Sequence, residues 1–204
     1  GLTTSGAGGN ATVVNAIVTD LGASLVDGNL AVSATTGALT DSATAVVAGT
    51  ATFETVANDA DITLNQLSVT GAIGLTTSGS GGNATVVNAI TTVLGVSLVD
   101  GNAAVSATTG NLTDSGIAVI AGTGTFETIA NNATITLNEL SVTGSLTLST
   151  SGAGGNVTIV NAIATDLIAQ SFSGNLAVTT TTGNLTDGGT VAVAGTGTFE
   201  TIAN

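Results

Sequence analysis

Short runs of β-prone residues alternate along this chain with clusters of Gly, Asn, Asp and Ser. In the first 73 residues the β-prone runs are Ala11–Ile17, Leu30–Thr35, Ala45–Val47, Thr52–Ala57, Ile62–Leu64, Leu67–Thr70 and Gly74–Thr77, the last crossing into the next copy of the pattern. The clusters between them hold the residue types that favour turns. The longest stretches without Gly show no sustained 3.6-residue period, so the pattern predicts short strands and no helices.

The same pattern returns every 73 residues. GLTTSGAGGNATVVNAI at 1–17 reappears as GLTTSGSGGNATVVNAI at 74–90 and as STSGAGGNVTIVNAI at 149–163. Residues 1–73 and 74–146 agree at 57 of 73 positions without a gap. The third unit, 147–204, is incomplete, so we expect the sequence to be a window from a longer array.

A gapless repeat of this kind favours a solenoid over a sandwich or a barrel. Each coil of a solenoid must present the same outline to its neighbours, whereas a sandwich has inequivalent strands and closes after one domain. Dividing the first unit at its turns gives coils at 9–27, 28–47, 48–66 and from 67 into the next unit. The sequence therefore predicts an all-β parallel β-solenoid over residues 1–204, one continuous segment with about four coils per unit and roughly eleven in all. Three coils of about 24 residues per unit remain an alternative.

Two series of residues recur at this spacing and are expected to have structural roles. Phe53, Phe126 and Phe199 would each place one large side chain in the core of a unit, while Phe172 has no counterpart. Asn10, Asn83 and Asn156 each follow Gly at the start of a coil. Their stacked amides could form hydrogen-bonded ladders along the rod, or they could serve only as turn residues.

The charge of the chain excludes several kinds of partner. It has 13 acidic residues and no Lys, Arg or His. Nucleic acids and anionic membrane surfaces are therefore excluded, because both are bound through basic side chains. No apolar run is long enough to predict insertion into a membrane. The recurring Glu54 and Asp41 series would form solvated rows with members ~19 Å apart on one face if each unit has four coils.

The inventory of side chains also argues against catalysis. Without His, Lys, Cys or Tyr, only carboxylates and hydroxyls remain as acids, bases or nucleophiles, and we expect no enzyme activity. Asp27, Asp59 and Asp61 are weak candidates for calcium ligands, since they lie in oxygen-rich turns. The second unit has Asn132 and Thr134 in place of Asp59 and Asp61, so we interpret these residues as turn caps and expect no cofactor.

Three segments carry a resemblance to a known repeat class: LSVTGAIGLTTSGSGGNATVVNAI at 67–90, TGNLTDSG at 109–116 and AGTGTFETIANNATITLNEL at 121–140. In repeat style and composition the chain resembles the filamentous-haemagglutinin-like β-helical repeats of very large bacterial surface and secreted proteins. The resemblance implies a right-handed parallel β-helix that serves as an adhesin stalk or a secreted-passenger shaft.

The sequence therefore leads to the hypothesis of a non-catalytic, protease-resistant structural shaft of a bacterial extracellular or cell-surface protein. Its expected partners are neighbouring copies or flanking segments stacked along the solenoid axis, with any host or surface ligand bound by domains outside this segment. A self-assembling extracellular filament or sheath fibre is the alternative. A Thr-rich face that binds ice or another ligand is a minor one, because paired Thr ranks would be needed on one face and the Thr pairs in the sequence are scattered.

Overall fold

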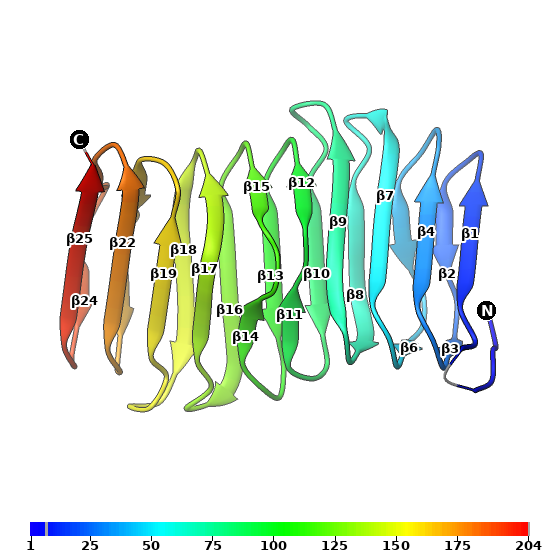
Figure 1. The fold of residues 1–204 in the computed structure, drawn as a ribbon, viewed down its shortest axis with the longest axis horizontal. Helices are drawn as coiled ribbons and strands as arrows, with labels where there is room; N and C mark the ends of the chain where they lie inside the picture. The colour runs from blue at the N-terminus through cyan, green and yellow to red at the C-terminus, as the bar shows by residue number, and fades with distance from the viewer. Residues whose placement is uncertain (7, 204) are drawn as a thin grey trace.

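The computed structural model of the chain describes residues 1–6 and 8–203 and shows a parallel β-solenoid (Figure 1). The described residues form 25 strands in two long sheets and one two-stranded sheet, and all their strand pairs are parallel. The rod has about nine turns of about 21 residues each. At ~4.8 Å per turn it is ~43 Å long. The described residues contain no helix, and hence none that could cross a membrane.

The strands follow the repeat units. Unit 1 contains β1 (Ala11–Asn15), β2 (Thr19–Leu21), β3 (Ser24–Val26), β4 (Leu30–Ala34), β5 (Leu39–Asp41), β6 (Ala45–Val47), β7 (Ala51–Asn58) and β8 (Ile62–Val69), and β9 (Ala72–Ser78) crosses into unit 2. Unit 2 continues with β10 (Ala84–Asn88), β11 (Thr92–Leu94), β12 (Ser97–Val99), β13 (Ala103–Ala107), β14 (Leu112–Asp114), β15 (Ala118–Ile120), β16 (Gly124–Asn131) and β17 (Ile135–Val142), and β18 (Ser145–Ser151) crosses into unit 3. Unit 3 contains β19 (Val157–Asn161), β20 (Thr165–Leu167), β21 (Gln170–Phe172), β22 (Leu176–Thr182), β23 (Leu185–Asp187), β24 (Val191–Val193) and β25 (Gly197–Ala203).

A typical coil has one straight side and one bent side. In unit 1 the straight side is a single strand, β1, β4 or β7, and these strands lie in the twelve-stranded sheet. The bent side is a pair of short strands, β2 with β3 or β5 with β6, in the eleven-stranded sheet. In the next coil β8 runs through the bend as one strand, pairing with β5 by its first half and with β6 by its second.

In unit 2 the two sides exchange sheets. Its straight strands β10, β13 and β16 lie in the eleven-stranded sheet, and its bent pairs β11 with β12 and β14 with β15 lie in the twelve-stranded sheet. From β1 to β19, its equivalent two units later, the twelve-stranded sheet takes seven steps, through β4, β7, β9, β11, β14 and β17. Two units therefore make seven turns, so one unit makes three and a half. Successive units are related by a half-turn about the rod axis, as the exchange of strands between the sheets requires.

This arrangement corrects the coil division made from the sequence. The first three predicted coils begin close to β1, β4 and β7, but no short coil closes after residue 67; instead, the coil that contains β9 continues into unit 2. The solenoid thus has neither four nor three coils per unit, and about nine turns in place of eleven. Glu54 and Glu127, in β7 and β16, consequently lie on opposite sheets. Equivalent acidic side chains on one sheet are seven turns or ~34 Å apart, not ~19 Å, which weakens their mutual repulsion further.

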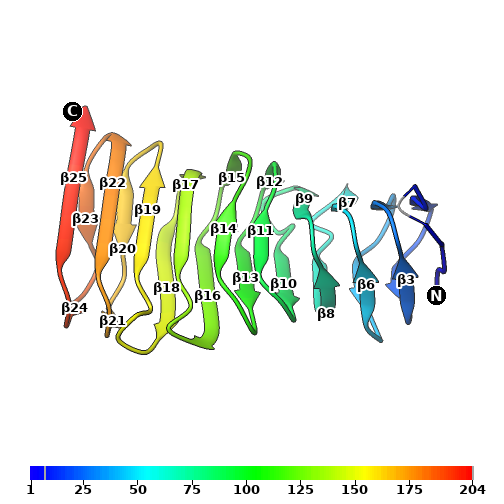
Figure 2. The same ribbon diagram turned by 60° about the horizontal axis from the view of Figure 1, so that its bottom comes forward.

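The core is a thin aliphatic stack between the two sheets. Alternate residues of each strand point inward, which gives buried positions such as Leu30, Val32 and Ala34 in β4. Equivalent inward positions pair from coil to coil, so Phe53 stacks between Val32 and Leu75. Figure 2 shows how the strands continue as one stack from β3 and β6 to β23 and β25. The core is therefore continuous through the junctions between units.

Glycines form a close-packed column along one edge of each unit. The N–H of Gly49 donates to the carbonyl of Gly28 at 2.9 Å, and the N–H of Gly71 donates to the carbonyl of Gly49 at 3.0 Å. A Cβ on Gly49 would lie 2.7 Å from the Gly28 carbonyl oxygen, closer than a carbon can approach. Only glycine lets the backbones of adjacent coils meet at the ladder spacing here.

Replacement of one glycine in this column is expected to destabilise the whole rod. Gly49→Ala should lower the free energy of unfolding by about 1–3 kcal/mol, because the new methyl group overpacks the column. The guanidinium midpoint measures the effect. Gly8→Ala is the matched control, since a Cβ there meets no atom within 4 Å. Equal midpoints for the two variants would show that the close packing of the glycine column does not require glycine at position 49.

The half-turn between units can be tested by cross-linking, because the chain has no cysteine. Thr63 in unit 1 pairs with Thr85 in unit 2. Adjacent strands place their Cα atoms ~4.8 Å apart, within the range of a disulfide. The Thr63→Cys/Thr85→Cys variant should oxidise to an intramolecular disulfide, detected by mass spectrometry. The Thr52→Cys/Thr85→Cys variant should stay reduced, since Thr52 lies in β7 on the other sheet. If a unit made three whole turns, β10 would stack on β7 and this second pair would be the one to oxidise, which would exclude the half-turn.

Candidate functional site

The junction between two units is the place where the regular stack needs special side chains. Here the bent strand β8 of unit 1 must pair with the straight strand β10 of unit 2. The register shifts within this pair: Leu64 pairs with Val86, and Leu67 pairs with Asn88. Asn65 and Gln66 are therefore bulged opposite a single residue of β10, and their N–H groups leave the ladder.

An aspartate of the preceding coil accepts the hydrogen bonds that the bulge releases. The Asp41 carboxylate accepts the N–H of Asn65 at 2.9 Å and the N–H of Gln66 at 2.8 Å. At the second junction Asp114 accepts the N–H of Glu139 at 2.7 Å. Unlike the solvated acidic row expected from the sequence, Asp41 and Asp114 thus satisfy backbone donors that would otherwise be lost.

A buried asparagine on the other side of the junction completes the ladder. The amide of Asn88, fully buried, accepts the N–H of Val69 at 2.8 Å and donates to its carbonyl at 3.1 Å. The side chain thereby replaces the peptide group that a continuing strand would provide. It also donates to the carbonyl of Thr91 at 3.0 Å and so fixes the turn after β10. Asn161 holds Val142 in the same way at the second junction.

The Asn10 series lies at a corner of the rod and binds the next coil. The Oδ1 atoms of Asn10, Asn83 and Asn156 accept the N–H groups of the asparagines one coil later at 2.7, 2.9 and 2.8 Å. Those asparagines, Asn29, Asn102 and Asn175, in turn accept the N–H of a threonine in the following coil. The amides thus form ladders along the rod, through contacts from side chain to backbone and not from amide to amide.

The three calcium candidates also accept backbone hydrogen bonds. Asp27 accepts the N–H of Gly6 at 2.9 Å, Asp59 that of Gly81 at 2.7 Å, and Asp61 that of Asn83 at 2.9 Å. Asn132, the counterpart of Asp59, has the same left-handed backbone, with a φ of 62° against 60°, and accepts the N–H of Gly154. A neutral amide therefore fills this role without charge. In residues 1–6 and 8–203 no three acidic side chains gather as a group that could hold a metal ion.

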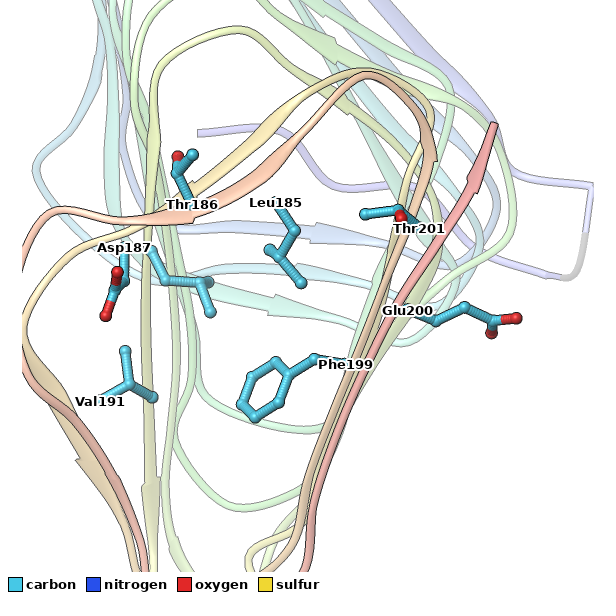
Figure 3. Close-up of a pocket in the computed structure, with 8 residues that line it drawn as sticks. Leu185, Thr186, Asp187, Val191, Phe199, Glu200 and Thr201 are labelled. Carbon is cyan, nitrogen blue, oxygen red and sulfur yellow. The ribbon is translucent and has the colours of Figure 1, made fainter. Parts of the chain in front are cut away.

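Phe53 and Phe126 are buried in the core, and Phe172 is buried where units 1 and 2 have Val26 and Val99. Phe199 is half-exposed and borders a hollow of about 480 Å³ at the last described coil, together with Leu185 and Val191 (Figure 3). The corresponding side chains of unit 1, Leu39, Ala45 and Phe53, are covered by the coil above them. The hollow is therefore the open cross-section of the core and not a built ligand site.

Threonines do form columns on the outer faces, one on each sheet. On the eleven-stranded sheet Thr40, Thr63 and Thr85 are stacked on adjacent coils, and Ala104 then interrupts the column. The same order recurs on the twelve-stranded sheet with Thr113, Thr136 and Thr158. A single column per face lacks the second, parallel rank that a flat ice-matching surface would need.

Asn88 and Asn161 were not among the residues predicted to have a role. They recur 73 residues apart, as the Asn10 series does, but they end valine-rich runs, which predict strands. Their position in the alternation contains the signal: Ala84, Val86 and Asn88 all point inward. An asparagine at an inward position of a strand must find hydrogen-bond partners inside the protein.

A scan against protein families matches three segments of the chain, 8–76, 81–140 and 154–204, to a family described as repeats of unknown function (DUF5649). The matches begin 73 residues apart, so the family's repeat coincides with the unit found in the sequence. No curated protein and no solved structure matches the chain.

Removal of the junction amide should cost much more stability than removal of the same residue elsewhere. Asn88→Ala leaves the buried N–H and carbonyl of Val69 without partners and creates a cavity, so we expect a loss of about 2–4 kcal/mol in unfolding free energy. Asn15→Ala is the matched control: Asn15 ends the same ATVVN strand, is only partly buried, and its side chain makes one hydrogen bond, to the carbonyl of Val18. Chemical denaturation of both variants measures the difference. Similar losses of unfolding free energy in the two variants would show that the hydrogen bonds from Asn88 to Val69 add no stability.

Proposed function

The chain belongs to this family of repeats of unknown function, and on that premise we propose that it forms a non-catalytic shaft, a rigid spacer within a larger extracellular or cell-surface protein.

The observation that carries the proposal is the continuity of the two sheets through both unit junctions. Strands from β1 to β25 follow one another in the twelve-stranded sheet, and strands from β2 to β23 do so in the eleven-stranded sheet. Bending such a rod would stretch the hydrogen bonds between coils on one side and compress a close-packed core on the other. Between the units, the described residues contain no linker at which the stack could hinge.

The side-chain chemistry supports a spacer role. The chain offers no His, Lys, Cys or Tyr for catalysis, and the ordered polar side chains at the junctions bond to backbone groups. The lack of Lys and Arg removes every site for trypsin-like proteases. A shaft exposed to such proteases outside a cell would benefit from both properties.

The repeat style supports an extracellular setting, since it resembles the β-helical repeats of bacterial surface and secreted proteins. The partners of the shaft would then be flanking solenoid segments stacked on its axis, with ligand recognition placed in other domains. A self-assembling filament is the alternative, because solenoid coils also stack between molecules when their edges are open.

The spacer proposal predicts how length depends on the number of units. Repeating residues 1–146 once more within the chain should add seven turns, or ~34 Å, to the maximum dimension. Small-angle X-ray scattering should show this increment with an unchanged cross-sectional radius of gyration. Thickening of the cross-section would contradict a shaft. Fibres of uniform width that lengthen with protein concentration, seen by negative-stain microscopy, would favour the filament.

A further inference from the structure

A small aliphatic patch lies on the outside of unit 2. Its pair Leu98 and Val119 has a counterpart in Leu25 and Val46 of unit 1, but only in unit 2 do Val96 and Ile117 extend the pair. Val96, Leu98, Ile117 and Val119 are 75%, 48%, 57% and 38% exposed. They form two adjacent rows, because Leu98 pairs with Val119 across β12 and β15, and Val96 precedes the pair of Ser97 with Ala118. Four branched side chains thus meet solvent together in one patch.

Some of the differences between units lie at this surface. Unit 1 has Ala23 and Thr44 where unit 2 has Val96 and Ile117, and unit 3 has Ala169 and Thr190. Asp20 and Asp166, near the same corner in units 1 and 3, are replaced in unit 2 by Val93. These changes improve no buried contact, since Val96 and Ile117 point outward. They enlarge an exposed apolar surface and remove a charge from its border.

Carboxylates occupy one border of the patch. Glu139 lies beside Ile117 in the next coil, because Ala118 pairs with Leu140. Glu139 is exposed, and unit 1 has the neutral Gln66 at this position. Asp114 adjoins it, accepting the N–H of Glu139. The patch therefore combines an aliphatic centre with a negative edge.

We propose that the patch of Val96, Leu98, Ile117 and Val119 docks a partner polypeptide whose contact surface is aliphatic and bordered by Lys or Arg. Charge complementarity selects this partner. A second copy of the chain would bring 13 further acidic residues and no basic one, with Glu139 and Asp114 near their own equivalents. A basic partner would pair its cations with these carboxylates and cover the four aliphatic side chains.

Two model peptides test the proposal: an alternating Leu-Lys 14-mer and the corresponding Leu-Glu 14-mer. Calorimetry at about 0.15 M salt should show that the Leu-Lys peptide binds the protein and the Leu-Glu peptide does not. Val96→Ala/Ile117→Thr should weaken Leu-Lys binding about tenfold, through lost apolar contact at unchanged charge. Ala and Thr occupy the equivalent positions of unit 1, so the fold tolerates them.

The matched control is Val14→Ala/Ile129→Thr, the same chemical changes at exposed side chains on β1, four strands from β12, and on β16 of the eleven-stranded sheet. It should leave Leu-Lys affinity within about twofold. Glu139→Gln, which restores the residue of unit 1, should weaken binding and reduce its salt dependence. Equal losses in the two double variants, or equal affinity for both peptides, would overturn the proposal. A wild-type dimer in sedimentation that dissociates in Val96→Ala/Ile117→Thr would also overturn it, since the occupant would then be a second copy.

Discussion

The parallel hydrogen-bond ladder between coils is the constraint from which the rest of the structure follows. Each backbone group that points along the axis must find its partner one turn later, because an unpaired group shielded from water is costly. Every coil must therefore repeat the outline of its neighbours. The glycine column, the inward aliphatic positions and the Asn10 series all keep the distance between adjacent backbones at the ladder spacing.

The conflict in this structure is between a bent side and a straight side that must pair. If a unit made an even number of half-turns, straight sides would always stack on straight sides and bent sides on bent sides. With seven half-turns per unit, the bent strand β8 must pair with the straight strand β10. Between two aligned pairs β8 has two residues and β10 has one. Asp41 and Asn88 resolve the mismatch from opposite sides, the first by accepting the released N–H groups and the second by extending the ladder. Polar side chains thus make the irregular step compatible with a continuous sheet.

Much of the fold could be predicted from the sequence, because period and turn residues are local signals. The 73-residue repeat and runs such as 11–17 and 30–35 indicated a parallel solenoid and placed β1 and β4 correctly. The strands β2, β3 and β5 were missed, although the equally short β6 was predicted, because they contain Asp20, Ser24 and Asp41, residue types that favour turns. The half-turn could not be predicted either. It depends on which strands pair between units, and the sequence of β9 does not show that it pairs with the straight strand β7 on one side and with the bent pair β11 and β12 on the other. Asp41 was recognised as recurrent, but its role depends on a bulge 24 residues away.

The half-turn between units gives the number of units a meaning beyond length. A domain joined to the end of such an array would project from one side of the rod after an even number of units and from the opposite side after an odd number. Gain or loss of one unit by recombination between near-identical repeats would therefore reverse the direction in which that domain faces. Gain or loss of two would preserve its direction and move it by ~34 Å. Parity, as well as length, would then be a property on which selection could act.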